Sequence, residues 1–325
     1  MEDKTIQNIL IYTRKNDVTV DKVIDWLYSY YGKNVYRINN GLIEFLQKNS
    51  LLIDVSASEI SINQNNINAI WLRKNPDVEI TLPHNDKTQK HIEDELNAIK
   101  FGIFAISKYS NKHILGTNAT YNSLDVNKIQ VLLMAKQLGL NIPPSIISNT
   151  KENILNFIDE YEKVVTKPAG NSTFFRGEGF TIGLYVNIFE KKHLEFYDDT
   201  IFPAFIQKGI EKEYELRIFY LAGRMYSCAI FSQSDKQTSI DYRDYNNQKP
   251  NRFVPYNLPK KIEKKLHLLM KSLSLNTGSI DMIKDKDGTY IFLEINPVGY
   301  FDMISHPCNY YLEEEVAKFL INEEK

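Results

Sequence analysis

Apolar residues in the first third of the chain alternate between short continuous runs and a helical repeat. Residues 8–13 and 35–38 are runs of the kind that form buried strands. Between them, apolar side chains recur every three or four residues, which predicts a helix with Thr19 as its N-cap and Gly32 as its stop. Three more short strands are expected at residues 51–55, 59–62 and 67–72. The N-terminal part is therefore expected to begin as a β-α-β unit.

This unit lacks the signature of a dinucleotide site. Residues 14–17, directly after the first strand, read Arg-Lys-Asn-Asp instead of a glycine-rich turn. A long helix follows at residues 86–108, with one apolar stripe that is expected to pack against the first sheet.

The rest of the chain alternates helices and strands without an internal repeat. One helix over residues 125–138 ends at Gly139, and a second helix covers residues 151–161. Strands are expected at residues 163–167, 179–189, 203–210, 213–221 and 225–232. A polar loop at 233–252, a helix around Leu266, a hairpin and a terminal helix around Val316 complete the pattern.

The hairpin near the C-terminus has the most specific chemistry. Asp287-Gly288 is a strong two-residue turn signal because both positions tolerate φ > 0. With that turn, Asp281 lies directly opposite Glu294, and Asn296 shares their face because strand side chains alternate.

Two opposed carboxylates in an apolar surrounding repel each other unless a cation stabilises them. Apolar residues flank both acids, so the sheet is expected to be covered on both faces. Carboxylate and amide oxygens on one face suit Mg²⁺ bound together with phosphate oxygens. The pattern favours a metal–nucleotide site; the alternative is a solvent-facing hairpin with hydrated charges.

Composition and charge narrow the function further. The chain has 325 residues, enough for two or three subdomains, and a formal net charge of −2 that gives no global attraction for nucleic acid. Cys228 and Cys308 are expected to be reduced thiols, and the six histidines show no zinc-ligand spacing. No signal peptide and no bilayer-spanning run is visible. We therefore expect a cytoplasmic protein that binds neither nucleic acid nor a membrane.

Polar residues at the expected strand ends follow one another in a recognisable order. They are Lys128, Lys167, Gln207-Lys208-Gly209-Ile210, Glu213, Arg217, Asp281, Glu294 and Asn296. This order resembles the ATP-grasp superfamily. Within it, residues 292–301 (Phe-Leu-Glu-Ile-Asn-Pro-Val-Gly-Tyr-Phe) and 307–313 look like the peptide maturases of the microviridin and grasp-with-spasm (graspetide) group. Residues 71–74 and 127–130 resemble further landmarks, although Lys74 stands where an arginine is common.

The resemblance implies a fold of the α/β and α+β class. It predicts an ATP-grasp fold with an N-terminal Rossmann-like α/β lobe, a central lobe and a C-terminal lobe, with ATP between the last two. The expected boundaries are residues 1–116, 117–190 and 191–325.

The resemblance also implies roles for the polar residues in binding ATP and Mg²⁺. The nucleotide would be bound by Lys128, Lys167, Gln207, Lys208, Ile210 and Glu213, with Ile283 opposite Phe292 as an apolar wall for adenine. The metal would be bound by Asp281, Glu294 and Asn296. Without the family, Lys128 reads as a solvated helix lysine, residues 206–210 as an ordinary edge strand, and Glu213 with Arg217 as an outward salt-bridged face.

Catalytic and substrate roles follow from the same resemblance. Arg217, Asn296 and Arg176 would act on the reacting groups, although the loop at 169–179 lacks a compact glycine-rich run and leaves the role of Arg176 open. Substrate contacts are expected from Arg73, Lys74 and Arg243. Residues 71–74 are a candidate surface for docking a leader peptide, unless Trp71 and Leu72 are simply core residues.

The implied activity is that of an ADP- and phosphate-forming ligase. It would activate a carboxylate as an acyl phosphate and join Asp or Glu to Thr, Ser or Lys side chains of a ribosomal precursor peptide, through ω-ester or ω-amide bonds. A ligase of free amino acids or of a protein tail, and a small-molecule kinase, would share the same ATP site. A non-catalytic peptide-binding module is disfavoured because it would not need the two acids and the amide together. The sequence leaves the leader motif and the choice between monomer and homodimer open.

Overall fold

The computed structural model describes residues 7–74, 86–109, 113–116, 126–170, 174–177, 180–183, 186–233, 242, 246 and 248–322. The chain divides into two compact units. The first comprises Met1–Asn122, Ser274–Thr277 and Tyr311–Lys325, and the second Ser123–Leu273 and Gly278–Tyr310. Among the described residues, no helix is both long and apolar enough to cross a membrane.

The first unit is built on a parallel sheet with the strand order β2-β1-β6-β7. Its strands are β1 (Asn8–Tyr12), β2 (Asn34–Ile38), β6 (Ala69–Leu72) and β7 (His113–Leu115). The helical segments α1 (Val18–Asp25) and η1 (Trp26–Tyr30) connect β1 to β2, so the predicted β-α-β opening is confirmed. A second sheet contains β3 (Leu51–Asp54), β4 (Glu59–Ile62) and β5 (Asn65–Asn66), and α2 covers Leu42–Leu46.

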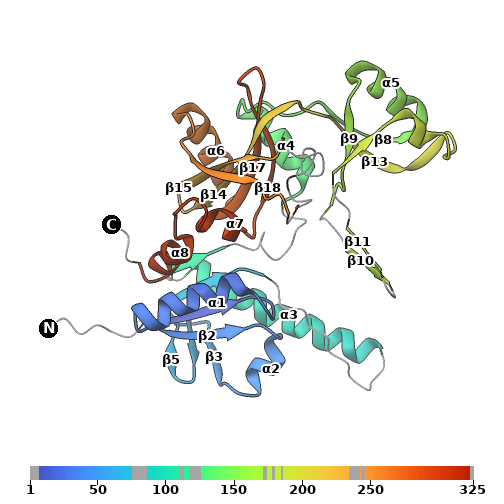
Figure 1. The fold of residues 1–325 in the computed structure, drawn as a ribbon. Helices are drawn as coiled ribbons and strands as arrows, with labels where there is room; N and C mark the ends of the chain where they lie inside the picture. The colour runs from blue at the N-terminus through green and yellow to red at the C-terminus, as the bar shows by residue number, and fades with distance from the viewer. Residues whose placement is uncertain are drawn as a thin grey trace. The chain divides into compact units, whose positions relative to one another are not determined.

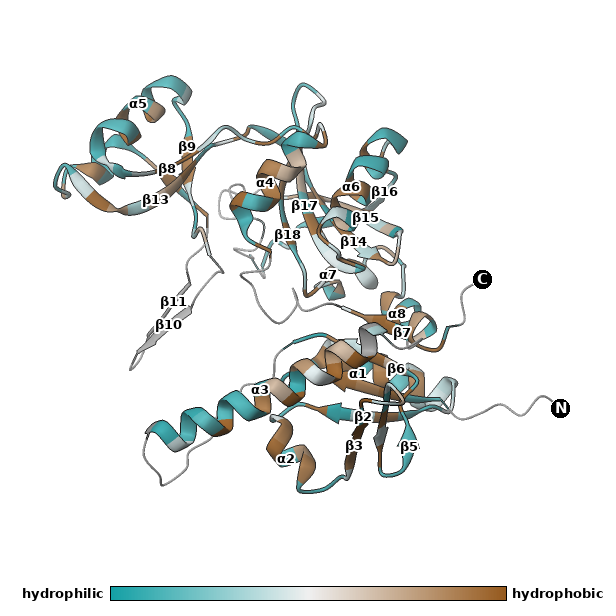
Figure 2. Cartoon of the chain, turned by 180° about the vertical axis from the view of Figure 1, so that it is seen from behind, coloured by the Kyte–Doolittle hydropathy of each residue, from teal (hydrophilic) through white to brown (hydrophobic). Residues whose placement is uncertain are grey.

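Helix α3 (Asp86–Tyr109) is mostly hydrophilic over its first turns (Figure 2). Toward its C-terminal end Ile103, Phe104 and Ile106 are buried in the core that also includes Leu10 and Ile70, and Leu96 packs against this core from a partly buried position. The stripe expected along the whole helix therefore meets the core from Leu96 onward.

The terminal helix α8 (Leu312–Leu320) belongs to the first unit. From the sequence it was expected in a C-terminal lobe of residues 191–325. It contacts α1, β6 and β7, and the ring of Phe319 lies 4.1 Å from that of His113. Nearby, Asn276 accepts a hydrogen bond from the backbone N–H of Gly116 and donates one to the carbonyl of Ile114. The two returning segments join this unit because they cover its sheet and bond to its last strand.

The second unit contains a four-stranded antiparallel sheet with the order β12-β9-β13-β8 (Figure 1). Its strands are β8 (Ser145–Thr150), β9 (Val164–Thr166), β12 (Asn187–Phe189) and β13 (Thr200–Lys208). Helix α5 (Lys151–Tyr161) packs on this sheet through Ile154, Phe157 and Ile158, which share a core with Ile206. Because β13 pairs with β8 and β9, the boundary expected at residue 190 separates strands of one sheet.

A separate hairpin stands in place of the single strand expected at residues 179–189. Strand β10 (Phe174–Gly177) pairs with β11 (Phe180–Gly183), and β12 begins afterwards.

A five-stranded sheet with the order β16-β15-β14-β17-β18 completes the second unit. Its strands are β14 (Lys212–Leu221), β15 (Arg224–Phe231), β16 (Arg252–Tyr256), β17 (Thr277–Asp285) and β18 (Tyr290–Asn296). The helices of this part are α4 (Lys128–Gln137), α6 (Lys260–Ser272) and the short α7 (Asp302–Ser305). Gly139, at φ +76°, follows the last turn of α4 as predicted. The turn of the C-terminal hairpin forms at the expected place but is one residue longer than predicted. The N–H of Asp285 donates to the carbonyl of Thr289, so residues 286–288 form the loop, and Gly288, at φ +81°, is its left-handed residue while Asp287 is not.

Candidate active site

A hollow of about 800 Å³ lies in the second unit, between its two sheets, and is open to solvent. Strands β9, β13, β14, β17 and β18 and the connection between β13 and β14 contribute to its wall. The lining residues used below are Lys167, Gln207, Ile210, Lys212, Glu215, Tyr242, Asp281, Ile283, Leu293 and Glu294. We call this hollow the central pocket. It brings residues from both halves of the second unit together, although they are far apart in the sequence.

The predicted opposition of the two acids is confirmed. Asp281 on β17 pairs directly with Glu294 on β18, and Asn296 pairs with Ser279. Both acids line the central pocket.

The predicted register fails one step further on. After Asp281 the ladder shifts, so that Met282 pairs with Phe292 and Ile283 with Ile291. The extra residue on β18 is Leu293, which forms a bulge and re-aims the side chains beyond it. Phe292 is fully buried away from the pocket, and Leu293 lines it together with Ile283. The expected pairing of Ile283 with Phe292 is therefore wrong: Ile283 pairs with Ile291, and the apolar residues of this hairpin that line the pocket are Ile283 and Leu293.

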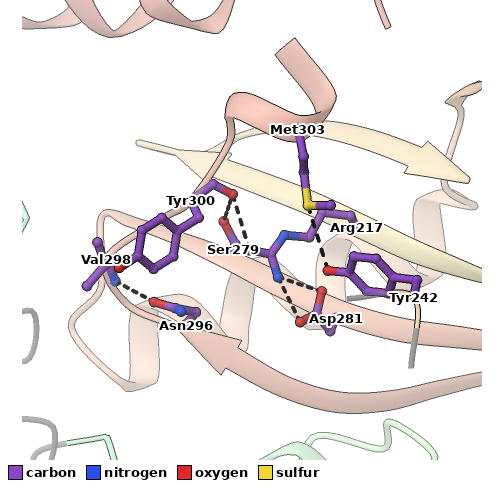
Figure 3. A network of polar contacts seen from close by, with 8 residues as sticks. All are labelled: Arg217, Tyr242, Ser279, Asp281, Asn296, Val298, Tyr300 and Met303. Carbon is purple, nitrogen blue, oxygen red and sulfur yellow. Dashed lines mark hydrogen bonds and ion pairs between the residues drawn. The ribbon is translucent and has the colours of Figure 1, made fainter. Parts of the chain in front are cut away.

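Asp281 has a cationic partner within the chain (Figure 3). Nη1 of Arg217 on β14 lies 2.7 Å from both carboxylate oxygens of Asp281, and the two residues are only 5% and 8% exposed. Nη2 of Arg217 donates to the carbonyl oxygen of Tyr300 at 3.2 Å, and the hydroxyl of Ser279 donates to the same oxygen at 2.7 Å. A buried guanidinium held on two sides keeps a fixed orientation.

Glu294 also has a cation nearby. Nζ of Lys128 lies 3.7 Å from its carboxylate and donates to the carbonyl of Pro168 at 3.0 Å. The sequence pattern suggested two carboxylates whose repulsion needs a bound cation. In the structure each carboxylate instead faces a basic side chain from another element of the chain. Lys128 is the first residue of α4, whose N-cap Asn127 accepts hydrogen bonds from the backbone N–H groups of Ile129 and Gln130.

Lys167 and Gln207 form the opposite wall of the pocket. Both are largely buried, and Nζ of Lys167 lies 5.5 Å from the ring centroid of Phe205. Nε2 of Gln207 donates to the hydroxyl of Ser145 at 2.8 Å, which fixes the amide. These contacts place a cation and an oriented amide on the pocket face of the four-stranded sheet.

The chain crosses from one sheet to the other through residues 208–211. The backbone N–H of Lys208 donates to Pro144, and that of Gly209 donates to Lys163. The ammonium of Lys208 lies over the ring of Tyr161, 5.4 Å from its centroid. Ile210 follows in the pocket wall. The crossing is therefore anchored up to Gly209 and turns its next residue toward the pocket.

Glu215, not Glu213, is the acid that β14 contributes to the pocket. The side chain of Glu213 is half exposed and pairs with Lys284 at 3.3 Å. Glu215 is 7% exposed, pairs with Lys212 and accepts a hydrogen bond from Ser232 at 2.9 Å. Regular strand alternation would place both acids on one face, but Lys212 and Glu215 share a face at a spacing of three, so the alternation is interrupted at the start of β14.

The expected docking surface around residues 71–74 is not a surface. Trp71 and Arg73 are 1% exposed, and Arg73 lies 5.3 Å from the ring centroid of Trp71. Asp17 pairs with Nε of Arg73 at 3.4 Å and with Nζ of Lys74 at 2.9 Å. Burial opposes ionisation of Asp17, yet Arg73, Lys74 and Thr13 together hold the pKa of its carboxyl below the usual value. Arg73 is thus a buried residue paired with Asp17, whereas Lys74, whose side chain is 18% exposed, pairs with the same carboxylate from a partly exposed position.

Two predicted residues lie outside what the structure describes: Arg243, and the side chain of Arg176 on β10. Conversely, the sequence pattern assigned no site role to Lys212, Glu215, Ser232, Tyr242 and Leu293. Tyr242 lines the pocket, and its hydroxyl lies 3.8 Å from Sδ of Met303 (Figure 3). The only sequence signal for any of them is the Lys-x-x-Glu spacing of Lys212 and Glu215 on β14. Regular strand alternation places two residues at that spacing on opposite faces, so the signal is weak.

The donor set around the two acids suits a hard cation. The described residues contain no group of three or more His, Cys, Asp or Glu side chains placed to bind a metal. Asp281 and Glu294 supply two carboxylates in register, and Asn296 follows Glu294 by two positions on the same strand. Two acids with an amide form an incomplete oxygen set, which is typical of Mg²⁺ that shares its coordination sphere with phosphates and water.

No family model and no curated protein matches this chain. Solved structures match it over nearly its whole length. A RiPP-associated ATP-grasp ligase from Chryseobacterium gregarium, in complex with ADP and a leader and core peptide, is 25% identical with a TM-score of 0.82 over 98% of both chains. The macrocyclase MdnC from Microcystis aeruginosa, bound with precursor peptide MdnA, is 26% identical with a TM-score of 0.74 over 97% of this chain and 100% of MdnC. D-alanyl-alanine synthetase A from Vibrio cholerae, at 13% identity and a TM-score of 0.56, shares the fold alone.

The similarity to the two peptide-bound ligases spans both units and includes the strands that form the central pocket. It confirms the resemblance and the α/β and α+β fold class that the order of polar residues suggested. The chain is an ATP-grasp ligase with the fold of the RiPP peptide maturases.

Proposed function

We propose that this ligase macrocyclises a ribosomal precursor peptide, using ATP and Mg²⁺ in the central pocket and an acyl phosphate as the activated intermediate. The observation that supports it most directly is the arrangement on β14, β17 and β18. A buried, doubly held Arg217 stands beside an acid that directly faces a second acid across the strand pair. Such an arrangement suits charge developing on a phosphoryl group more than simple peptide binding.

The adenosine end of ATP fits the crossing between the two sheets. Ile210 and Leu293 offer apolar contact, and the backbone after Gly209 can read an adenine edge. Glu215 lies on the same strand between this crossing and Arg217, the position at which a ribose would lie. Lys167 and Lys128 then bring positive charge to the phosphates from two other elements.

Asp281, Glu294 and Asn296 are the residues that would hold Mg²⁺. The ion supplies charge neutralisation for the phosphates and for the transferring phosphoryl group. Arg217 would add a second positive charge next to Asp281 and is oriented before substrate arrives, because Tyr300 and Asp281 already hold both of its Nη atoms.

The proposed reaction has two steps. A carboxylate oxygen of an Asp or Glu side chain attacks the γ-phosphorus, the bond to the β-phosphate oxygen breaks, and ADP leaves. A Thr or Ser hydroxyl, or a Lys amine, then attacks the acyl carbon; its proton is lost and inorganic phosphate departs. The product is an ω-ester or ω-amide ring, and the peptide has lost one water per ring. We place the reaction in the cytoplasm, where Cys228 and Cys308, both free here, stay reduced.

Mass spectrometry of an acidic precursor peptide incubated with the protein, ATP and Mg²⁺ tests this proposal. We expect ADP, free phosphate and a peptide lighter by whole waters. A stable phosphopeptide would establish the kinase alternative. Ligation of free amino acids without any change in the peptide would establish the other ligase alternative.

A further inference from the structure

A second concave surface lies outside the central pocket, at the far end of β14. It is an open groove of about 1260 Å³ between the β14–β15 turn and helix α6. Its walls include Arg224, Met225, Tyr226, Lys260, Lys264 and Leu268. We call it the α6 groove.

A strongly basic helix, α6, forms one wall of the α6 groove. Helix α6 contains five lysines and a single glutamate, in a chain whose formal net charge is −2. The one acid, Glu263, is already bonded to Lys260 at 2.8 Å. Lys264 is exposed and has no acidic partner among the residues that the structure describes. Much of α6 is coloured hydrophilic in Figure 2. A concentration of positive charge on an acidic molecule creates a local field for anionic partners.

The groove is also lined by aromatic and apolar side chains. The ring of Tyr226 lies 5.6 Å from that of Tyr310 in an edge-to-face arrangement, and Leu268 is 51% exposed. His267, another lining residue, hydrogen-bonds to the hydroxyl of Tyr220 at 2.9 Å. Cations together with aromatic and apolar side chains suit a short peptide segment that has both acidic and apolar side chains.

We propose that the α6 groove docks an acidic segment of the peptide substrate, away from the residues being joined. This inference rests on the proposed function, in one respect: a peptide that supplies Asp and Glu side chains as acyl donors is necessarily rich in negative charge. Two copies of this chain meeting groove to groove would oppose like charges. A nucleic acid would have to approach a molecule that is acidic overall.

The spacing along β14 sets the reach that such a peptide needs. Glu215 lines the central pocket and Gly223 lines the groove. Strand β14 ends at Leu221, six positions after Glu215, which is about 20 Å at the usual rise per residue, and the turn to Gly223 follows. An extended peptide covers that distance with about six residues, so a docked segment and a reacting side chain must be at least that far apart in the substrate. Docking then raises the effective concentration of the reacting side chain at the pocket.

The test is a direct binding measurement that needs no turnover. The probe is a fluorescein-labelled 12-residue peptide of Glu, Asp, Leu and Phe, and the readout is fluorescence anisotropy at low salt without nucleotide. The groove variant is Arg224→Glu with Lys264→Glu. The matched control is Lys261→Glu with Lys271→Glu, which changes the net charge equally on exposed positions of α6 that do not line the groove.

We expect the groove variant to bind the probe at least about tenfold more weakly and the control to bind within about twofold of wild type. Thermal melting confirms that both variants fold. In turnover assays with a precursor peptide that the wild-type enzyme cyclises, the groove variant should have a higher KM for the peptide and an unchanged KM for ATP. Equal losses in both variants, no loss in the groove variant, or equal binding of a single-stranded DNA of the same charge would overturn the docking site. Absence of ring formation in wild type, with groove-dependent binding intact, would overturn the proposed function instead.

Discussion

At the scale of single residues, the site depends on ion pairs that join different strands. Arg217 and Asp281 are both buried and share two short contacts, whereas Lys128 reaches Glu294 at a longer distance from a partly exposed position. The buried pair is structural as well as functional, because removing one partner leaves the other charge buried alone. Asp281 and Glu294 should therefore differ in what they contribute to stability.

Asp281→Asn should lower the free energy of unfolding by about 3–5 kcal/mol, since it strands the buried Arg217. Glu294→Gln should change it by less than about 1 kcal/mol, because its pair is looser and more exposed. Urea denaturation of the two variants checks the difference. Both should lose turnover, so a stable but inactive Asp281→Asn would show that Arg217 finds another partner in the chain.

Glu213 and Glu215 offer a matched pair for the nucleotide site. Glu215→Gln removes a buried charge bonded to Lys212 and Ser232 in the pocket wall, and Glu213→Gln changes only a half-exposed pair with Lys284. We expect Glu215→Gln to weaken ATP binding at least about tenfold and Glu213→Gln to leave it within about twofold. Calorimetric titration with a non-hydrolysable ATP analogue measures both. The reverse order would show that Glu213, and not Glu215, binds the nucleotide.

At the scale of elements, small irregularities decide which side chains face the pocket. The bulge at Leu293 keeps Asp281 and Glu294 opposed but removes Phe292 from the pocket face. The first turn of α4 directs Lys128 toward Glu294 and Pro168 because Asn127 fixes where that helix begins. The glycine that ends α4 and the position of the hairpin turn were readable from the sequence. The N-cap expected at Thr19 was wrong, because α1 begins at Val18 after Asp17, and strand alternation failed at the start of β14. The bulge was not readable either, because one additional residue leaves no compositional mark.

Asn127→Ala should cost about 1 kcal/mol of stability and weaken ATP binding. The cap bonds to Ile129 and Gln130 are lost, and the first turn that positions Lys128 then frays. Asn127→Asp retains the cap and serves as the control. If Asn127→Ala binds ATP as tightly as Asn127→Asp, the position of Lys128 does not depend on the cap.

At the scale of the whole molecule, the chain returns to its first unit after building the second. Helix α8 buries Leu312, Val316, Phe319 and Leu320 although it follows the active-site strands in sequence. Its apolar stripe predicted that the helix packs against a sheet, but not that this sheet is the one with β6 and β7. An apolar stripe can pack against any exposed apolar face, so the pattern does not specify the partner.

Phe319→Ala should destabilise the first unit by about 3–5 kcal/mol through the cavity it leaves beside His113. Hydrogen exchange should accelerate in β6 and β7, while β14 and β17 keep their protection. Equal acceleration in both sets of strands would show that the two units unfold as one. Ile262→Ala on α6, a partly buried position of the second unit, is the comparison variant.

The sequence by itself determined the fold class, the β-α-β opening, the existence of the hairpin that carries Asp281 and Glu294, and the resemblance to peptide maturases. These follow from local signals: turn residues, periodicity, and the order of polar residues at strand ends. Tertiary structure alone decided that Arg217 pairs with Asp281, that Glu215 replaces Glu213 in the pocket, and that Arg73 is buried against Asp17. The physical reason is the same in each case. A charge finds its partner through three-dimensional proximity and desolvation, and neither quantity is encoded in spacing along the chain.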